Sequence, residues 1–260
     1  MKETLDDYIE ETISFIKDNI PEEGNMLAFS GGKDSLVTKW CMDKAGHGYE
    51  LVYTYTTIDP PEVVKFIREH FPECRIIRPK RTFWKMIGPY NPPTFRYRWC
   101  CYELKKKPSY YLPHYHRVFG IRSEESNARK EYPRIEVWER NVKRTMPEHK
   151  RYYPILHWPE WAVWELIERE NIPYPSLYDE GFTRIGCVVC PMRRKPEHDR
   201  WRARYPGMYK VFEKCVHRWW HKRNDTGRPM NNDSPKGFMD DWYRQESRWY
   251  KGKKKNDSDS

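Results

Sequence analysis

Apolar positions at helical spacing open the chain, and short apolar runs separated by further helical patterns follow them. The first helix is predicted to begin after Thr4, which can cap it, and to end at Pro21. Its apolar positions recur every three or four residues: Leu5, Tyr8, Ile9, Ile13, Ile16 and Ile20. This spacing is typical of an amphipathic helix that packs on a core.

Five short segments read as strands or extended chain because they are rich in apolar and β-branched residues. They are residues 26–29, 51–57, 75–78, 117–122 and 152–156. Helical patterns follow the first two, and residues 159–170 are predicted to form a helix buried through Trp161, Trp164 and Ile167. Strands that alternate with helices predict an α/β fold with a parallel sheet and right-handed crossovers.

Composition narrows the class of protein. Of the 260 residues, 16% are aromatic, which disfavours long disorder, and 33% are charged. No run approaches the roughly 18 consecutive apolar residues of a membrane-spanning helix. The N-terminal segment is acidic and amphipathic, unlike a signal peptide. We therefore expect a soluble, cytoplasmic protein with no membrane partner.

The formal net charge of +10 is concentrated near the C-terminus. Residues 1–190 hold 29 Lys and Arg against 28 Asp and Glu, whereas residues 191–260 hold 19 against 10. In residues 193–250 the cations alternate with aromatic residues: Trp201, Tyr205, Tyr209, Trp219, Trp220, Trp242, Trp249 and Tyr250. The segment is either a surface that binds RNA or another nucleic acid, or a helical extension whose aromatic side chains pack internally. Residues 251–260 are predicted to be a disordered tail.

A Gly-rich loop, Ser-Gly-Gly-Lys-Asp-Ser at residues 30–35, lies between the first predicted strand and the next helix. Its glycines let the backbone approach a phosphate, and the helix start presents free N–H groups and a positive dipole. Lys33 adds a positive charge, and Ser30 and Ser35 add hydroxyl donors. The spacing matches neither the Walker loop nor the dinucleotide-binding loop. The loop is therefore predicted to bind the phosphates of a nucleotide.

This hexapeptide resembles the signature of the PP-loop, or adenine nucleotide α-hydrolase, superfamily. Its members include ATP pyrophosphatases that adenylate substrates, tRNA-thiolating enzymes and phosphoadenosine phosphosulfate reductases. The resemblance implies a Rossmann-like sheet flanked by helices, with the loop after the first strand gripping the phosphates of an adenine nucleotide.

The seven cysteines include two pairs that are separated by 85 residues. Cys100 and Cys101 are adjacent, and Cys187 and Cys190 form a Cys-x-x-Cys motif. Four thiolates can close a zinc site or an iron–sulfur site. Adjacent cysteines are awkward for a structural zinc site, whose paired ligands normally leave two to four residues between them.

The quartet resembles the [4Fe–4S] site of adenylylsulfate reductases, within the phosphoadenosine phosphosulfate reductase family. Residues 120–126 (Gly-Ile-Arg-Ser-Glu-Glu-Ser) and the segment from Pro154 to Trp164, which precedes a Tyr-Asp-x-Gly loop, are also similar to that family. The resemblance implies a cluster on four cysteines: Cys100, Cys101, Cys187 and Cys190. It also places a PP-loop nucleotide-binding domain with this site at residues 1–192, followed by a basic helical extension at residues 193–250.

The same resemblance implies a set of nucleotide-binding residues: Ser30, Gly31, Gly32, Lys33, Asp34, Ser35, Asp59, Gly120 and Arg122. Three of them, Lys33, Asp34 and Arg122, are expected to act in catalysis. Asp34 is a candidate to hold Mg²⁺ on the phosphates of ATP, with helix capping as its alternative role. Arg122 is expected to contact a phosphate or sulfate. Asp59 is expected to contact adenine or ribose, or else to shape a turn.

Two departures from the reductase pattern favour ATP chemistry. Sulfonucleotide reductases carry a catalytic cysteine in a Glu-Cys-Gly context near the C-terminus, whereas the last cysteine here, Cys215, has no following glycine. The loop also keeps an intact Ser-Gly-Gly-Lys-Asp-Ser, as the ATP-cleaving members do. We therefore predict ATP-dependent adenylation of an acceptor for sulfur transfer, with a redox or sulfur-donor protein as partner. The alternatives are a sulfonucleotide reductase that releases sulfite, and a non-catalytic nucleic-acid-binding module that holds zinc.

Overall fold

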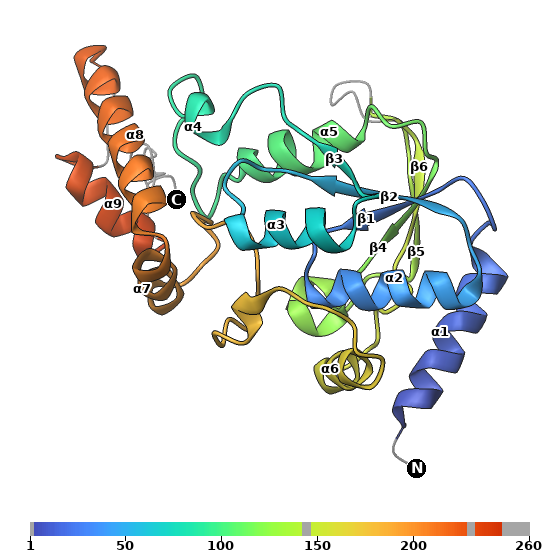
Figure 1. Cartoon of the computed structure of the whole chain (residues 1–260). Helices are drawn as coiled ribbons and strands as arrows, with labels where there is room; N and C mark the ends of the chain where they lie inside the picture. Colours follow the sequence, from blue (N-terminus) through green and yellow to red (C-terminus); the bar gives the residue numbers. More distant parts are fainter. Residues whose placement is uncertain (1–2, 142–146, 228–231, 246–260) are drawn as a thin grey trace, which may run out of the picture. The chain divides into compact units, whose positions relative to one another are not determined.

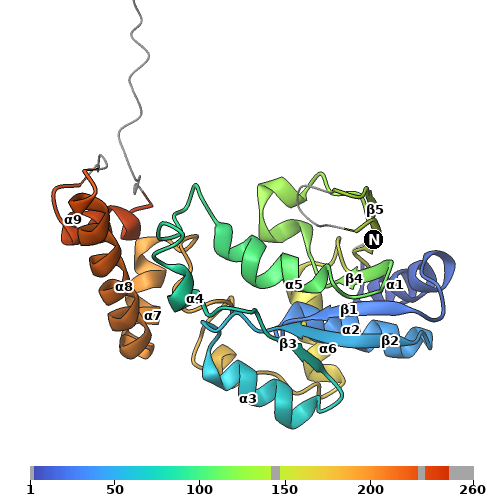
Figure 2. The same cartoon turned by 90° about the horizontal axis from the view of Figure 1, so that it is seen from above.

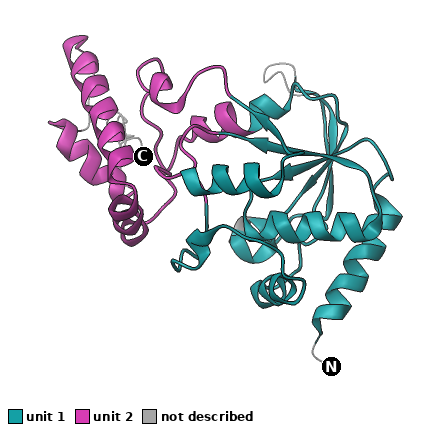
Figure 3. Ribbon diagram, in the orientation of Figure 1, with its two compact units in different colours: residues 1–55, 60–78, 106–185 teal, residues 56–59, 79–105, 186–260 magenta. Residues whose placement is uncertain are grey.

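A mostly parallel sheet of six strands organises one of the two units into which the chain folds. The computed structural model describes residues 3–141, 147–227 and 232–245. Unit 1 comprises residues 1–55, 60–78 and 106–185, and unit 2 comprises residues 56–59, 79–105 and 186–260 (Figure 3). The predicted disordered tail, with Trp249 and Tyr250, lies outside the described residues.

The sheet of unit 1 has the order β3-β2-β1-β4-β6-β5. Its strands are β1 (Asn25–Phe29), β2 (Tyr49–Thr54), β3 (Arg75–Ile77), β4 (His116–Phe119), β5 (Ile135–Trp138) and β6 (His149–Tyr152). Neighbouring strands from β3 to β6 are parallel, and β5 pairs antiparallel with β6. Figure 2 shows β3 and β5 at opposite edges. This confirms the predicted α/β fold, with one antiparallel edge strand added.

Helices cover both faces of this sheet. They are α1 (Leu5–Asn19), α2 (Lys33–Ala45), α3 (Pro61–His70), α5 (Lys107–Ser109) and α6 (Glu160–Arg169). Because α2 and α3 belong to successive crossovers in the same direction, the right-handed rule puts them on one face. Figure 1 shows α2, α3 and α6 below the sheet and α5 above it. The central strand is buried accordingly, with Met26, Leu27 and Phe29 all inaccessible to solvent.

The N-terminal helix forms as its sequence predicts. Thr4 accepts a hydrogen bond from the Asp7 amide, and the Asp7 carboxylate accepts one from the Thr4 amide, which completes a capping box. The inward face buries Leu5, Ile9 and Ile16. Helix α1 packs against α2 and α6, so this cap stabilises the layer that lies under the first strand.

Three local expectations need correction. The segment predicted as extended at residues 152–156 contains only the last residue of β6, and the strand lies before it. Strand β5 was not predicted. Its four residues, Ile-Glu-Val-Trp, are too few to show a clear alternation of apolar and polar positions, and the strand forms by pairing with β6. Trp161 is 46% exposed and Trp164 is half-buried, whereas Ile167 on the same helix is buried. The inward positions of α6 are Ala162, Val163, Leu166 and Ile167, so Trp161 lies at the border of the apolar face.

Unit 2 is helical. It contains α4 (Phe83–Met86), most of a π-helix (Cys101–Lys106), α7 (Lys195–Arg204), α8 (Pro206–Asp225) and α9 (Pro235–Tyr243). Helix α8 packs against α4, α7 and α9. All four cysteines of the quartet fall in this unit, together with the basic extension. The domain boundary predicted at residue 192 follows the sequence motifs, whereas the contacts group residues 79–105 with residues 186–245.

None of the helices in the described residues is long and apolar enough to cross a membrane.

The loop after β4 touches the first turns of α2 at Gly120. A Cβ atom on Gly120 would lie 2.7 Å from both the Asp34 carbonyl oxygen and Thr38 Oγ1. Thr38 Oγ1 is itself fixed, because it donates to that carbonyl at 2.8 Å. This close approach of two backbones requires glycine and places the β4 loop beside the loop at residues 30–35.

Replacing this glycine is expected to destabilise the fold. Gly120→Ala forces a methyl group against backbone, so we expect the free energy of unfolding to fall by about 1–3 kcal/mol in urea denaturation. Gly207→Ala is the matched control, since a Cβ at Gly207 meets no atom within 4 Å and lies in helix α8. The control is expected to be neutral or slightly stabilising. Equal stability of the two variants would contradict the close contact.

Candidate functional site

The loop between β1 and α2 turns sharply at Gly31. Its φ is +69°, and a Cβ there would meet Ile67 Cγ1 of helix α3 at 3.0 Å. The left-handed backbone and the close contact both require glycine. Gly32 is the N-cap of α2 and has no side chain to cap it. The start of a helix carries partial positive charge, which favours an anion.

Hydroxyl groups hold the shape of this loop. Ser35 Oγ lies 3.1 Å from Ser30 Oγ and donates to the Gly32 carbonyl at 2.8 Å. The Gly32 amide donates to Ser30 Oγ at 3.3 Å. The loop predicted from sequence therefore forms as a closed, internally bonded turn at the start of a helix. Its binding of phosphate stays a prediction.

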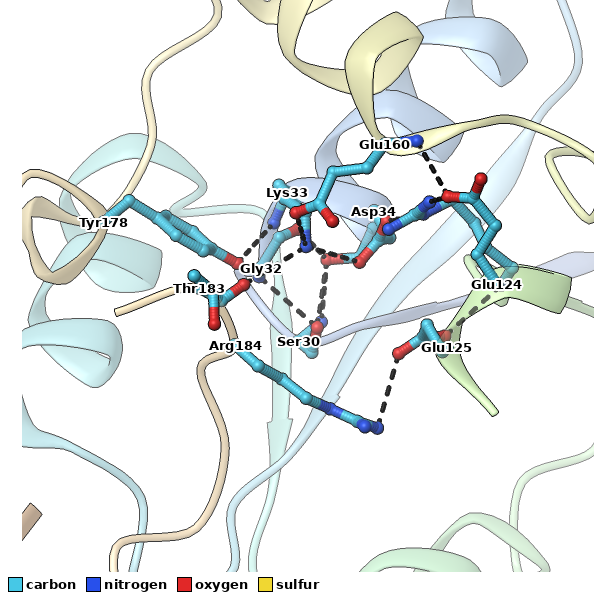
Figure 4. Close-up of polar contacts among 12 residues, drawn as sticks. Ser30, Gly32, Lys33, Asp34, Glu124, Glu125, Glu160, Tyr178, Thr183 and Arg184 are labelled. Carbon is cyan, nitrogen blue, oxygen red and sulfur yellow. Dashed lines mark hydrogen bonds and ion pairs between the residues drawn. The ribbon is translucent and has the colours of Figure 1, made fainter. Parts of the chain in front are cut away.

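Lys33 is buried at this turn among compensating groups (Figure 4). Its Nζ lies 3.6 Å from Asp34 Oδ2 and 3.6 Å from Glu160 Oε1, and it donates to the Thr183 carbonyl at 3.4 Å. A buried ammonium group needs such partners, because desolvation without them is costly. The ammonium charge is thereby held at the start of α2 instead of extending into solvent.

Arg122 is the second buried cation of the site. Its Nε donates to Asp34 Oδ1 at 2.5 Å, and its Nη1 donates to Glu124 Oε2 at 2.8 Å and to the Trp158 carbonyl at 3.2 Å. The predicted catalytic residues Lys33, Asp34 and Arg122 therefore meet in one network. Each oxygen of Asp34 pairs with one of the two cations, so a Mg²⁺ ion bound there has to compete with them; the metal role of Asp34 stays a prediction.

Tyr178, from a 3₁₀ turn (Ser176–Tyr178), reaches the same helix start. The Lys33 amide donates to the Tyr178 hydroxyl at 3.0 Å, and the Tyr178 hydroxyl lies beside Gly32. Burial raises the pKa of Tyr178, so the phenol stays protonated at neutral pH. A neutral hydroxyl that accepts from the helix start keeps its own hydrogen for a further acceptor.

The turn that follows β2 belongs to unit 2 and lies beside the second cysteine pair. Thr56 donates to Asp59 Oδ2 through its amide at 2.6 Å and its hydroxyl at 2.8 Å, and its Oγ1 lies 3.5 Å from Cys187 Sγ. The Val188 amide donates to the Ile58 carbonyl at 2.7 Å. Thr57 has a φ of 68°, an unusual value for a β-branched residue. Asp59 thus shapes this turn in the structure, and its predicted nucleotide contact stays a prediction.

The four cysteines of the quartet lie in unit 2, and none of them forms a disulfide bond. A hydrogen bond to Cys101 and burial raise the pKa of Cys100, and the charges of Cys187 and Cys190 add to the shift. Burial raises the pKa of Cys187 to about 11, although Lys105 opposes this shift. These mutual effects indicate one neighbourhood of sulfur atoms.

A donor set of four thiols is the set that a [4Fe–4S] cluster takes. In the ranges 3–141, 147–227 and 232–245, no group of three or more His, Cys, Asp or Glu side chains is arranged to hold a metal ion. Lys105 lies among the cysteines, and the charge of Cys187 is the main cause that raises the pKa of Lys105. The positive charge of Lys105 suits a site with anionic sulfur ligands. The cluster itself stays a prediction.

Arg193 holds the Cys-x-x-Cys loop in place through its carbonyl groups. Its Nη1 donates to the carbonyls of Cys187 and Val188, and its Nη2 donates to that of Gly186 at 3.5 Å. The guanidinium stacks on the Trp201 ring, 3.8 Å from the ring centroid. Burial lowers the pKa of Arg193, while the charge of Cys190 acts in the opposite direction. A buried cation therefore supports the loop that carries two of the four thiols.

The aromatic residues of the extension pack inside unit 2. Six of those singled out in the sequence are buried: Trp201, Tyr205, Tyr209, Trp219, Trp220 and Trp242. Tyr209 donates to the Val188 carbonyl at 3.2 Å and bonds with His198 Nδ1 at 2.9 Å. Burial lowers the pKa of His198 to about 3, so the ring is neutral. For these six residues the structure favours internal packing over base stacking.

Several site residues were not candidates in the sequence. Tyr178 lies in the Tyr-Asp-x-Gly loop, which was noted only as a family likeness. Glu124 and Glu160 matter because Arg122 and Lys33 are buried, and burial is not visible in a motif. The only sequence signal for Arg193 is its place three residues after Cys190.

With this geometry in view, comparison with known proteins identifies the class. The phosphoadenosine phosphosulfate reductase domain matches residues 24–193. The chain therefore belongs to the phosphoadenosine phosphosulfate reductase domain family of the adenine nucleotide α-hydrolase superfamily.

Two relatives show how far the likeness extends. An uncharacterised protein of Methanocaldococcus jannaschii is 32% identical over 233 residues, which cover 85% of this chain and 47% of that protein. An adenosine 5'-phosphosulfate reductase of Oceanobacillus iheyensis is 25% identical over 197 residues, which cover 72% of this chain and 79% of the reductase. The chain spans about half the length of the first curated relatives that it matches.

Two solved structures share the fold. The phosphoadenylyl-sulfate reductase of Candida auris, solved as a phosphate complex, has a TM-score of 0.51 at 19% identity and covers 69% of this chain and 87% of its own. The FMN adenylyltransferase of Candida glabrata, solved with ATP, has a TM-score of 0.50 at 18% identity. The match covers 71% of this chain and 61% of the adenylyltransferase chain. At this level of identity the likeness establishes the α/β fold.

Arg193 offers a test of how the cysteine loop is held. Arg193→Ala removes the donor from three carbonyls, so we expect the free energy of unfolding to fall by about 2–4 kcal/mol. Arg194→Ala is the matched control, because that neighbouring arginine is exposed, and its effect should stay below about 0.5 kcal/mol. Urea unfolding followed by tryptophan fluorescence measures both. Similar stability of the two variants would show that the hydrogen bonds of Arg193 to these carbonyls contribute nothing to the free energy of unfolding.

Proposed function

We propose that the chain is an iron–sulfur PP-loop enzyme that uses ATP with Mg²⁺ to adenylate an acceptor for sulfur transfer. The observation that carries this proposal is the intact loop at residues 30–35, closed at the start of α2, with Lys33 and Arg122 joined through Asp34. Two cations held beside a helix N-terminus suit a polyphosphate. Adenylation with ATP is thus a more specific activity than membership of the family implies.

In the proposed reaction an acceptor oxygen attacks the α-phosphorus of ATP. A new phosphorus–oxygen bond forms, the bond to the bridging oxygen of the β-phosphate breaks, and pyrophosphate leaves with the electron pair. The acceptor proton passes to solvent or to a base. Amides of the loop bind the leaving pyrophosphate, Lys33 neutralises its charge, and Arg122 binds a phosphate of the nucleotide. Glu124 and Glu160 hold the two cations so that little reorganisation accompanies the reaction.

The adenylated acceptor is then an electrophile for sulfur. A sulfur nucleophile delivered by a sulfur-donor or redox protein attacks the atom of the acceptor that carries the adenylated oxygen. A bond from sulfur to that atom forms, its bond to the oxygen breaks, and AMP leaves with the oxygen and the electron pair. Cys100, Cys101, Cys187 and Cys190 would hold the [4Fe–4S] cluster, which supplies sulfur-binding or electron-transfer chemistry when bound. Arg193 and Thr56 position Cys187, and Lys105 places a positive charge near the thiolates.

Burial of Cys215 argues against the alternative of a sulfonucleotide reductase. That reaction needs a thiol that attacks sulfur, and the last cysteine of the chain lies on the inward face of α8 at 3% exposure. Arg218 donates to its sulfur at 3.4 Å, which fixes the thiol within the helix packing. A buried thiol of this kind is a packing residue.

A parallel titration tests the nucleotide. We expect the anaerobically purified protein to bind ATP with Mg²⁺ more tightly than adenylylsulfate or phosphoadenylylsulfate in calorimetry. Lys33→Met should weaken ATP binding by about 10–100-fold, the loss of one charge-assisted phosphate contact. Lys44→Met, exposed on the same helix, is the control and should change it less than twofold. Preference for a sulfonucleotide, with sulfite release that Cys215→Ser abolishes, would overturn the proposal in favour of the reductase.

Measuring the iron and acid-labile sulfide content of the same protein tests the cysteine quartet. We expect about four of each per chain, the content of a [4Fe–4S] cluster. Cys187→Ser should lose most of the iron, whereas Cys74→Ser, at a buried cysteine outside the quartet, should keep it. Zinc without iron in the unmodified protein would instead support a zinc-containing binding module.

A further inference from the structure

Helix α8 has two faces of opposite character. Its inward face buries apolar and aromatic residues: Tyr209, Phe212, Val216, Trp219 and Trp220. Its outward face carries a basic row of four exposed cations: Lys210, Lys214, Arg218 and Lys222. His217 and His221 lie beside this row, with their ring centroids 4.4 Å apart. Four of the 19 Lys and Arg residues at positions 191–260 are thus aligned along one helix.

The basic row is not explained by the stability of the helix. Elsewhere in the chain, three lysines pair with an acid four residues further on: Lys39–Asp43, Lys65–Glu69 and Lys195–Asp199. In the basic row the first three cations, Lys210, Lys214 and Arg218, each have another cation at that position. Like-charge pairs at this spacing destabilise a helix.

The two acids of α8 do not neutralise the row. Glu213 accepts from Arg202 at 2.7 Å and from the Tyr243 hydroxyl at 3.1 Å, and Asp225 is the last residue of the helix. Among the described residues, no ion pair joins an acid to Lys210, Lys214 or Lys222. The row therefore presents its charge to solvent.

The spacing of the row indicates the kind of partner. With a rise of 1.5 Å per residue, cations four residues apart repeat about every 6 Å and extend over about 18 Å. A single small anion uses one or two such charges, whereas a polyanion with a regular charge repeat uses them all. The aromatic residues of α8 are buried, so this helix surface offers no contacts to base faces.

We propose that the basic row of α8 binds the phosphodiester backbone of a nucleic acid. Such contacts position a nucleic acid without reading its sequence, and they weaken as salt rises, because binding releases counterions. The surface lies outside the loop at residues 30–35 and the cysteine quartet. This proposal can therefore be tested independently of the adenylation reaction.

Fluorescence anisotropy with the full chain tests this surface. The probes are labelled 20-nucleotide RNA and DNA of one sequence, titrated from about 50 to 300 mM salt, with polyglutamate as competitor. Lys210→Gln, Lys214→Gln and Lys222→Gln combined should weaken binding at least tenfold. The slope of log affinity against log salt should become shallower by about 2, which corresponds to three lost phosphate contacts on a single strand. The relative affinity for RNA and DNA identifies which backbone is preferred.

The matched control removes three lysines from other surfaces. Lys17→Gln, Lys44→Gln and Lys65→Gln combined give the same change in net charge at exposed positions, and binding should change less than twofold. Equal loss in both triple variants would mean that net charge alone drives association and would overturn the proposal. Absence of saturable binding at low salt would overturn it as well. Competition by polyglutamate as strong as that by unlabelled RNA would assign the row to an acidic protein instead.

Discussion

The first turn of α2 is the constraint on which unit 1 depends. The chain can reach this helix from β1 only through the left-handed turn at Gly31, and the β4 loop can lie against it only because Gly120 has no side chain. These two close approaches bring Arg122 to Asp34. Burial then makes the carboxylates obligatory, because neither cation is stable there without them.

The cysteine quartet depends on a different set of contacts. Its second pair lies on a short loop that has few backbone partners of its own, and Arg193, Tyr209 and the turn at Ile58 supply them. Arg193 is the last residue that the family domain matches, and Tyr209 lies in the extension that follows it. The extension therefore belongs to the cysteine site structurally, whatever else its charged surface binds.

The extension resolves two interpretations that its composition left open. Alternating cations and aromatic residues suit either nucleic-acid stacking or internal packing. In α8 the two residue types separate by helical periodicity, so that the aromatic residues stabilise unit 2 and the cations remain on its surface. The same segment thus supports the cysteine loop from one face and offers a charged row on the other.

The sequence by itself determined the α/β fold, the turn at residues 30–35 and the family, because these depend on short-range patterns: apolar periodicity, glycines at a strand–helix turn, and ordered motifs. It also singled out Lys33, Asp34 and Arg122. Only the tertiary structure decided that Glu124, Glu160 and Tyr178 complete their network, that Asp59 shapes a turn beside Cys187, and that Arg193 supports the cysteine loop. Each of these facts concerns a buried polar group, and the partners that such a group requires are selected by proximity in space, which residue spacing does not encode.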